Sequence, residues 1–307
     1  MTKKNRNKIH PETRAKIAFL GTGIMGLPMC GHLLKAGYPV QVWNRSPEKA
    51  APLAELGATL CGSPSEAVAG AKYIISMLST GPVIDQVLFQ ADSTGNTVEQ
   101  RLDEGATVIM MSSIPVETAR DQATRLRKIN VDYVDAPVSG GDIGAVNARL
   151  AILAGGDSES IANVQDLLSV MGRVSHVGPV GCGQLVKLAN QTIVGININA
   201  VAEAFLLIEA GGGDLAAAHK ALIGGFADSA ILRHHGERMI NRSFKPGATA
   251  ETQLKDMRTS RELAESLGLD LPVLQLTESL YQGMCQNGRE DLDHSGLYLE
   301  IADRTKA

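Results

Sequence analysis

A single lysine, Lys187, interrupts the most apolar stretch of this 307-residue chain. From residue 184 to residue 208 the side chains are apolar almost all round, and Lys187 and Glu203 are the only charged residues. This pattern is typical of a helix buried in a helical domain or in a dimer. Burying an ammonium group without a partner is costly, so a purely structural position would not favour lysine. Lys187 is therefore either a proton donor in a reaction site or a side chain that extends from the first helical turn into solvent.

Two amide side chains follow this lysine at helical spacing. Asn190 and Gln191 stand three and four residues after Lys187, so all three share one face of the expected helix. If Lys187 takes part in a reaction, Asn190 and Gln191 are the candidates to position it or to bind its substrate.

A glycine-rich loop precedes the first expected helix. Gly21, Gly23 and Gly26 form the pattern GxGxxG between an expected strand at 16–20 and an expected helix at 27–35. In this setting the first glycine permits a tight turn, the second lets the backbone approach a pyrophosphate, and the third allows close helix–strand packing. Together with Ile24 and Met25, these residues predict a dinucleotide site at the helix N-terminus, whose unpaired N–H groups attract an anion.

The end of the second expected strand distinguishes the two nicotinamide dinucleotides. An NAD site usually carries Asp or Glu there, whereas this chain has Asn44, Arg45 and Ser46. No carboxylate repels a 2′-phosphate at this place, and the guanidinium of Arg45 can pair with one. The sequence therefore favours NADP(H) as cofactor, with NAD(H) still possible.

Short apolar strands alternate with helices over the first half of the chain. Most of these strands lack charge and are rich in β-branched residues, as expected of strands covered on both faces. The expected strands span residues 16–20, 40–44, 73–78, 107–111, 132–137, 150–156 and 174–178, and two clear helices span 47–56 and 116–129. The alternation predicts a parallel, doubly wound sheet.

After a cluster of turn residues at 178–183 every segment has the pattern of a helix. The expected fold class is α/β, with an N-terminal Rossmann-type doubly wound sheet followed by an all-α domain. We expect a disordered basic leader at 1–14, a dinucleotide-binding Rossmann domain at 15–179, and an all-helical substrate and oligomerisation domain at 180–307. The leader carries Lys3, Lys4, Arg6 and Lys8. The long apolar helix favours self-association as a dimer or tetramer.

Charge and cysteine content narrow the possible partners and location. A formal net charge of −4 gives no general attraction to nucleic acid or to anionic membranes. No segment matches a secretory signal, and none is expected to be long and apolar enough to span a bilayer. The four cysteines, Cys30, Cys61, Cys182 and Cys285, lack the spacing of a metal site or a disulfide framework. We therefore expect a cytoplasmic protein with reduced thiols and no bound metal.

Four sequence blocks together resemble the β-hydroxyacid dehydrogenase family, over residues 16 to about 301. They are Gly21-Thr-Gly-Ile-Met-Gly-Leu-Pro-Met29, Asp135-Ala-Pro-Val-Ser-Gly-Gly141, Gly181-Cys-Gly-Gln-Leu-Val-Lys-Leu-Ala-Asn-Gln191, and Leu254-Lys-Asp256 with Asp293 further on. The family includes 3-hydroxyisobutyrate dehydrogenase, tartronate semialdehyde (2-hydroxy-3-oxopropionate) reductase and the glyoxylate/succinic semialdehyde reductases. The resemblance implies an NAD(P)-dependent oxidoreductase that interconverts a small β-hydroxy acid and its semialdehyde.

The resemblance also implies roles for individual residues. Lys187 would donate a proton to the developing alkoxide during reduction, and oxidation would reverse that step. Ser139, Gly140 and Gly141 would bind the carboxylate of the substrate at the end of a strand. Further cofactor contacts are implied for Met77, Leu78, Ser79, Ser113 and Lys255. The chain departs from many relatives at Met110, where an acidic residue is common.

The family resemblance leaves the substrate open. Tartronate semialdehyde is the first choice, because the Leu-Ala-Asn-Gln sequence after Lys187 and the Met111-Ser-Ser-Ile114 block resemble that branch slightly more. The alternatives within the family are 3-hydroxyisobutyrate and glyoxylate or succinic semialdehyde. More distant alternatives are an imine reductase and a non-catalytic dinucleotide-binding protein, and the presence of Lys187 weighs against both.

Overall fold

The computed structural model describes residues 14–304, so Lys3, Lys4, Arg6 and Lys8 of the expected leader lie outside the described residues. The chain divides into two compact units that meet between Lys187 and Leu188. The boundary expected from the sequence, between residues 179 and 180, lies eight residues earlier. The difference arises because Gly181 and Gln184, at the start of the next helix, are hydrogen-bonded to Asp135 at the end of a strand of the first unit.

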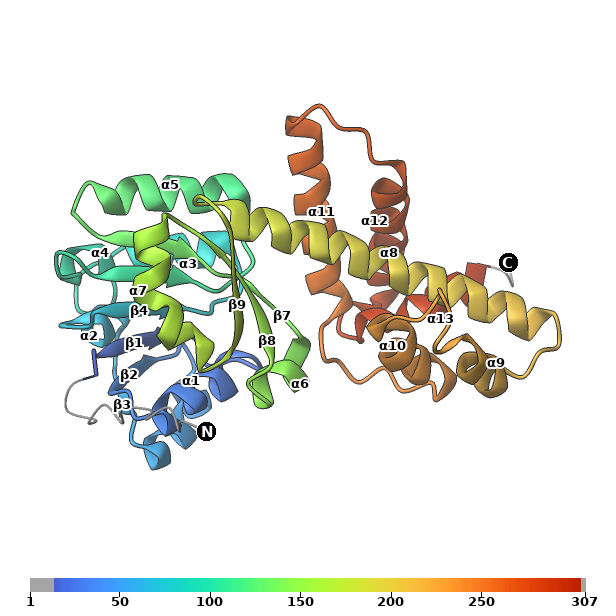
Figure 1. The fold of residues 1–307 in the computed structure, drawn as a ribbon, viewed down its shortest axis with the longest axis horizontal. Coiled ribbons are helices and arrows are strands. Elements are labelled where there is room, and N and C mark those ends of the chain that lie inside the picture. The colour runs from blue at the N-terminus through green and yellow to red at the C-terminus, as the bar shows by residue number, and fades with distance from the viewer. Residues whose placement is uncertain (1–13, 305–307) are drawn as a thin grey trace, which may run out of the picture. The chain divides into compact units, whose positions relative to one another are not determined.

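The first unit is built on one nine-stranded sheet (Figure 1). Its strands are β1 (Ile17–Leu20), β2 (Val40–Trp43), β3 (Thr59–Leu60), β4 (Tyr73–Ser76), β5 (Thr107–Met110), β6 (Asp132–Asp135), β7 (Val138–Ser139), β8 (Leu150–Gly155) and β9 (Gly172–Gly178). They run in the order β3-β2-β1-β4-β5-β6-β8-β7, and β9 pairs with β8. All neighbours from β3 to β6 are parallel, which confirms the Rossmann-type sheet.

The sheet is not parallel throughout. Strand β8 runs antiparallel to both β6 and β7, whereas β9 is parallel to β8. Only the short helix α6 (Gly141–Val146) lies between β7 and β8. A parallel crossover needs a dozen or more residues, so this connection turns the chain back instead. The mixed edge was not expected from the sequence.

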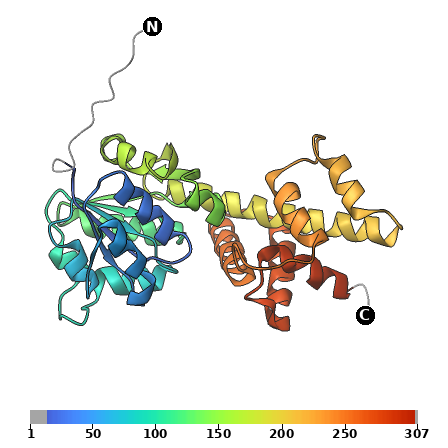
Figure 2. The same cartoon turned by 90° about the horizontal axis from the view of Figure 1, so that it is seen from below.

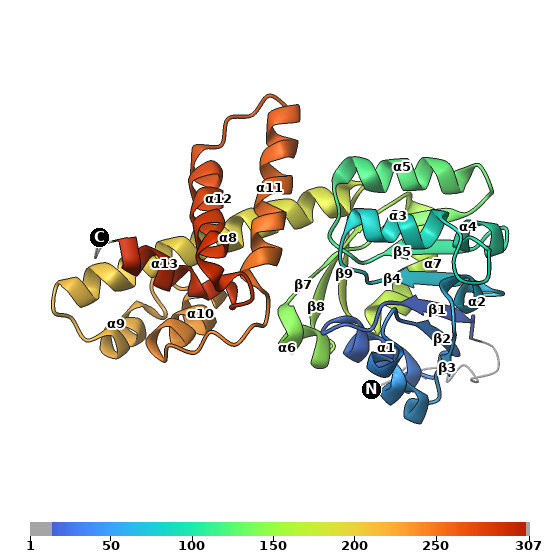
Figure 3. The ribbon, with the colours of Figure 1, turned by 180° about the vertical axis from the view of Figure 1, so that it is seen from behind.

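Helices cover both faces of this sheet, and the strand residues divide between two apolar cores. Ile17 and Phe19 of β1 pack in one core, and Ala18 and Leu20 pack in the other. Helices α1 (Gly26–Lys35) and α7 (Ser158–Ser169) cover the first face, while α2 (Pro64–Val68), α3 (Gly81–Phe89), α4 (Val98–Arg101) and α5 (Val116–Arg127) cover the second (Figure 3). Burial on both sides explains why these strands read as apolar runs rather than alternating patterns.

One expected helix takes a different form. The segment 47–56 forms two 3₁₀ helices, η2 (Pro47–Lys49) and η3 (Ala51–Leu56), instead of one α-helix. Pro52 lies inside this segment, where it lacks an N–H donor and its ring clashes with the preceding turn of an α-helix.

The second unit is helical (Figure 2). The helix α8 (Cys182–Ala210) begins in the first unit and continues into the second, which also holds α9 (Leu215–Leu222), α10 (Ala230–Ile240), α11 (Ala250–Ser266), α12 (Pro272–Met284) and α13 (Leu297–Arg304). Short π- and 3₁₀-helical turns, η4 (Cys285–Arg289) and η5 (His294–Gly296), connect α12 to α13. Phe205 of α8 packs with Met257, Tyr281 and Tyr298 in the core of this unit.

Helix α8 corrects the expectation about bilayer-spanning segments. Among the described residues it is the one helix that is long and apolar enough to cross a membrane by length and composition. The scattered amides between residues 184 and 208 do not offset its many aliphatic residues. The core helix of a soluble protein meets the same criterion, and α8 contributes Ile198 and Phe205 to the core of its own unit.

Candidate active site

The glycine loop after β1 has the geometry that a dinucleotide site needs. Gly21 has a φ of +103°, and a Cβ on it would lie 2.4 Å from the carbonyl oxygen of Met77. A Cβ on Gly26 would lie 2.0 Å from the carbonyl oxygen of Gly21. By contrast, no atom lies within 4 Å of the position that a Cβ on Gly23 would take. The outer two glycines are therefore required for packing, whereas the middle one faces open space where a pyrophosphate could approach.

The helix that follows this loop presents an uncapped N-terminus. No side chain caps α1 at Met25, and its first turn contains no acidic residue. The side chain of Ile24 in the loop is 66% exposed. The positive end of the helix dipole favours an anion at such a place. The residues of this loop fit the pyrophosphate of NAD(P).

The turn after β2 ties itself to the glycine loop. The side-chain oxygen of Asn44 accepts a hydrogen bond from the N–H of Thr22 at 2.8 Å. The side-chain amide of Asn44 donates to the carbonyl oxygen of Ser46, also at 2.8 Å. The Arg45 side chain is exposed. Asn44 therefore holds the shape of the loop, and Arg45 is the residue of this turn with a charge to offer a ligand.

The ends of β4 and β5 meet through a buried serine that the sequence reasoning passed over. The hydroxyl of Ser112 accepts a hydrogen bond from the N–H of Leu78 at 2.8 Å. Ser112 is 1% exposed, whereas Ser113 is partly buried and Ser79 is exposed. Ser113 stays a predicted cofactor contact, and the structure adds Ser112 as the residue that bonds to Leu78. The pair of adjacent serines, Ser112 and Ser113, was the sequence feature that could have indicated this contact.

The segment expected to bind a carboxylate ends β7. Ser139 pairs with Ala151 of β8 and is partly buried, and Gly140 and Gly141 are exposed. Both glycines have positive φ, +135° and +63°, a region that side chains rarely adopt. No atom lies within 4 Å of the position that a Cβ on Gly141 would take. The backbone of this turn at Gly141 therefore faces open space.

Lys187 lies one turn beyond a tightly held helix start. Asp135, the last residue of β6, accepts hydrogen bonds from the N–H groups of Gly181 and Gln184, both at 2.8 Å. Burial raises the pKa of Asp135 to about 6, although these N–H groups act to lower it. Lys187 itself is partly buried. The sequence reasoning gave Asp135 and Gln184 no role, although both stand in the blocks that carry the family resemblance.

In the helical unit, α8 and α11 are joined through Asp256. The amide of Gln191 donates to one oxygen of Asp256 at 2.8 Å, and the ammonium of Lys255 lies 3.0 Å from the other. Asn190 donates to the side-chain oxygen of Gln191 at 3.0 Å. The structure thus brings Asn190, Gln191 and Lys255 together around a carboxylate to which the sequence reasoning assigned no task. Lys187 lies three and four residues before Asn190 and Gln191 on the same helix.

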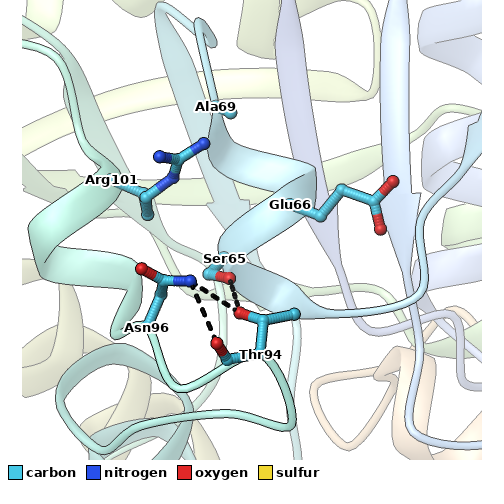
Figure 4. Close-up of a pocket in the computed structure, with 6 residues that line it drawn as sticks. All are labelled: Ser65, Glu66, Ala69, Thr94, Asn96 and Arg101. Atoms are coloured by element: carbon cyan, nitrogen blue, oxygen red, sulfur yellow. Dashed lines mark hydrogen bonds between the residues drawn. The ribbon is translucent and has the colours of Figure 1, made fainter.

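A shallow hollow of about 210 Å³ lies elsewhere on the first unit, between α2 and α4 (Figure 4). Its polar side chains bond to one another. The hydroxyls of Ser65 and Thr94 lie 3.2 Å apart, and Asn96 donates to the Thr94 hydroxyl at 2.9 Å. The carboxylate of Asp92 accepts the N–H of Ser65. These bonds assign the hollow to the packing of α2 against its neighbours rather than to a reaction.

A second polar cluster lies in the helical unit around Asp293, which is completely buried. One oxygen of Asp293 lies 3.1 Å from the guanidinium of Arg238, and the other accepts the Ser295 hydroxyl at 2.6 Å. Ligand atoms of His235, Asp293 and His294 lie within 4.8 Å of one another, as in some metal sites. A guanidinium already bound to the same carboxylate opposes a further cation, so we assign the cluster to the stability of the helical unit.

Comparison with known proteins places both units in one family. Residues 16–181 match the NAD binding domain of 6-phosphogluconate dehydrogenase, and residues 181–301 match a domain described as NAD-binding of NADP-dependent 3-hydroxyisobutyrate dehydrogenase. The chain is 39% identical to 2-hydroxy-3-oxopropionate reductase of Escherichia coli over 92% of its length and 95% of the relative. It is 33% identical to a probable 3-hydroxyisobutyrate dehydrogenase-like protein (like 1, mitochondrial) of Arabidopsis thaliana, over 94% of this chain and 86% of the relative.

A solved structure agrees with these matches. The 3-hydroxyisobutyrate dehydrogenase of Mycobacterium tuberculosis, solved with L-serine, superposes with a TM-score of 0.85 at 28% identity, over 94% of this chain and 99% of that one. The family expected from the four sequence blocks is thereby confirmed. The chain belongs to the β-hydroxyacid dehydrogenase family and is an NAD(P)-dependent oxidoreductase.

Proposed function

We propose that this member of the family is an NADP(H)-dependent 2-hydroxy-3-oxopropionate (tartronate semialdehyde) reductase in which Lys187 is the general acid. The observation that carries the proposal is the full-length similarity to a relative of that name. The lysine's place on α8, one turn after a helix start held by Asp135, is consistent with it. The 3-hydroxyisobutyrate dehydrogenases among the relatives make 3-hydroxyisobutyrate the second candidate substrate.

In the proposed reaction the chain's residues bind the substrate and move one proton. The nicotinamide ring, when bound, supplies or accepts the hydride. Ser139 and the N–H groups of Gly140 and Gly141 bind the carboxylate of the substrate. The ammonium of Lys187 donates a proton to the carbonyl oxygen as negative charge develops on it, and the neutral amine takes that proton back during oxidation. Asn190 hydrogen-bonds the substrate or the lysine from the same helical face.

The cofactor preference is proposed from the turn after β2. Arg45 is exposed beside a loop that fits a pyrophosphate, and no carboxylate stands at position 44 to repel a 2′-phosphate. Arginine is well suited to phosphate because its planar guanidinium donates two parallel hydrogen bonds. Lys255, Met77, Leu78, Ser79 and Ser113 remain proposed contacts of the cofactor.

We also propose that the protein self-associates in the cytosol. On the helical unit, Ile193 and Leu207 of α8 are 61% and 75% exposed, and large exposed aliphatic side chains on one helix are typical of a subunit interface. All four cysteines are free thiols, as a reducing compartment would keep them. Sedimentation at micromolar concentration tests the first proposal, and fractionation of cells tests the second.

The function is tested with a panel of hydroxy acids and semialdehydes, assayed with NADPH and NADH at 340 nm. Tartronate semialdehyde with NADPH should give the highest kcat/KM. Lys187→Ala should lower kcat about 10²–10⁴-fold, the usual share of general acid catalysis, while NADPH binding persists. Lys220→Ala, which removes an exposed lysine of the helical unit, is the matched control. Near-normal turnover by the folded Lys187→Ala variant would remove the lysine from the mechanism.

A further inference from the structure

The helix that carries Lys187 has no cap of its own. Gly181, the residue before α8, has no side chain, and the first turn of α8 contains no acidic residue. The four N–H groups at a helix start need acceptors from elsewhere when they are buried. Asp135 supplies two acceptors from the end of β6, with one carboxylate oxygen on the N–H of Gly181 and the other on that of Gln184. The N–H of Cys182 bonds to the carbonyl oxygen of Pro179.

Backbone contacts leave this carboxylate and this helix start little room to move. A Cβ on Gly183 would lie 2.3 Å from the carbonyl oxygen of Leu153 and 2.5 Å from that of Asp135. A Cβ on Gly155 would lie 2.5 Å from a carboxylate oxygen of Asp135. Glycine at both positions lets the first turn of α8 touch the ends of β6 and β8 directly.

Gln184 extends the same contact to two further strands. It is completely buried, its side-chain oxygen accepts the N–H of Ile114 at 3.1 Å, and its amide donates to the carbonyl oxygen of Ser112 at 2.8 Å. The Ser112 hydroxyl in turn accepts the N–H of Leu78 after β4. The first turn of α8 is thereby fixed to the ends of β4, β5 and β6, where the cofactor contacts are proposed.

Stability alone does not explain a carboxylate at position 135. Burial raises its pKa to about 6, compared with about 4 in an unfolded chain. A raised carboxyl pKa means that the folded protein binds the proton more tightly than the unfolded chain does. The stabilisation from that proton is present at low pH and is lost as the pH rises through about 6. At neutral pH the ionised carboxylate of Asp135 therefore lowers the stability of the folded protein, and its presence needs another explanation.

We propose that Asp135 is a positioning residue for Lys187. Together with Gln184, its carboxylate fixes the first turn of α8 to the strand ends and so holds Lys187 in place relative to them. This rests on the proposed function, in which Lys187 is the proton donor. The negative charge also opposes the positive end of the α8 dipole.

Few other ionisable groups face this carboxylate. On α5, Arg120 lies beside Gly181 and pairs with Glu117 at 2.6 Å. On β9, His176 bonds to the carbonyl oxygens of Gly156 and Gly178. On β6, burial raises the pKa of Tyr133 well above its ordinary value, so its phenol stays neutral. His176 is the imidazole among these groups, so it is replaced in the control variant.

The first test is the pH dependence of kcat for semialdehyde reduction between pH 5 and pH 8. Reduction is chosen because it is the direction in which Lys187 is proposed to donate its proton. The wild type should lose turnover as the pH falls through about 6. Asp135→Asn keeps one acceptor oxygen but turns an amide toward the second N–H, so kcat should fall ~10–100-fold. Its pH profile should also lose the acid limb, that is, the fall in kcat at low pH. His176→Gln, the control, should keep that limb. A limb that disappears with His176→Gln, or persists in Asp135→Asn, overturns the proposal.

The second test is a double-variant cycle with Lys187→Ala. If Asp135 acts through the lysine, Asp135→Asn should change kcat less than about twofold in the Lys187→Ala background. Full additivity of the two effects overturns the positioning role, even if both variants are impaired. Unimpaired turnover by Lys187→Ala instead refutes the proposed function, so the two failures are distinguishable. If Asp135→Asn does not fold, Gln184→Met breaks the same connection and should show the same non-additivity.

Discussion

The Asp293 cluster makes a sharp prediction about the helical unit. Asp293→Asn removes the charge but preserves the size of the side chain. The wild-type carboxylate accepts the N–H of Gly247 at 3.0 Å, the N–H and hydroxyl of Ser295 at 3.1 and 2.6 Å, and lies 3.1 Å from Arg238. In the variant an amide must face the Arg238 guanidinium or the donors of Ser295, so at least one buried donor loses its acceptor.

The size of the effect follows from the burial of the two partners. Removing one member of a buried ion pair costs about 3–5 kcal/mol, because the other charge is left uncompensated. The Arg238 side chain is 29% exposed, so water can solvate part of the freed guanidinium. We therefore expect the lower end, about 3 kcal/mol, which lowers the Tm of a unit of this size by roughly 10 °C.

The chain offers a means of watching the two units separately. Its one tryptophan, Trp43, lies on β2 of the first unit, so tryptophan fluorescence reports on the sheet. Circular dichroism at 222 nm includes the helices of the second unit. In Asp293→Asn the circular dichroism transition should shift to lower temperature and begin before the fluorescence transition.

A neighbouring carboxylate provides the control. Asp291 is exposed two residues away, and Asp291→Asn should change stability by less than about 0.5 kcal/mol. If Asp293→Asn and Asp291→Asn melt together, the cluster contributes no stability and our reading of it is wrong.

The difference in stability between the wild type and Asp293→Asn should depend on pH in a definite direction. Burial by itself would raise the pKa of Asp293, but hydrogen bonds from His235 and Ser295 and the charge of His294 bring it below its ordinary value. A lowered carboxyl pKa gives stability that is present above the unfolded-state pKa of about 4 and is lost as the pH falls through the folded-state value. The stability difference between the wild type and Asp293→Asn should therefore be present at neutral pH and narrow as the pH falls below about 4.

Two further predictions concern the ligands. Arg45→Leu should lower kcat/KM for NADPH at least about tenfold and leave that for NADH nearly unchanged, because a charge-assisted bond to the 2′-phosphate is lost; an equal loss with both cofactors would refute the assignment. An uncharged C3–C4 aldehyde should have a kcat/KM at least about tenfold below that of the matching semialdehyde acid, and Ser139→Ala should narrow the gap. Equal efficiency on both aldehydes in the wild type would mean that the site recognises shape rather than charge.

The parts of the site encoded by local spacing were predictable from the sequence. The contact at Gly26 lies within the turn between one strand and one helix, so GxGxxG between those elements is enough to predict it, whereas the contact of Gly21 with Met77 joins the turn to a distant strand end. Strand positions were also predictable, because burial on both faces leaves an unbroken apolar run. The strand expected at 16–20 is observed at Ile17–Leu20.

The parts that depend on distant partners were not predictable. The carboxylate of Asp135 bonds to Gly181, which lies 46 residues later and directly precedes α8, and a sequence pattern does not show which helix start lies beside a strand end. The hydroxyl of Ser112 bonds to the N–H of Leu78 across 34 residues, so a sequence pattern does not show that contact either. Likewise Asp256 bonds to Gln191 across 65 residues, so its role in joining two helices becomes visible only in the folded unit.

The two hydrogen bonds of Asn44 limit how the cofactor preference of this protein can change, in evolution or by engineering. Aspartate at position 44 would still accept the N–H of Thr22, but it would set a carboxylate against the carbonyl oxygen of Ser46, to which the amide now donates. The one-residue route toward NAD therefore passes through a variant with a weakened turn and a distorted glycine loop. Arg45 has no such second task among the described contacts of this turn. Variants that drift or are designed toward NAD should accordingly change at position 45 first, and acquire an acid at position 44 only after the turn has been rebuilt.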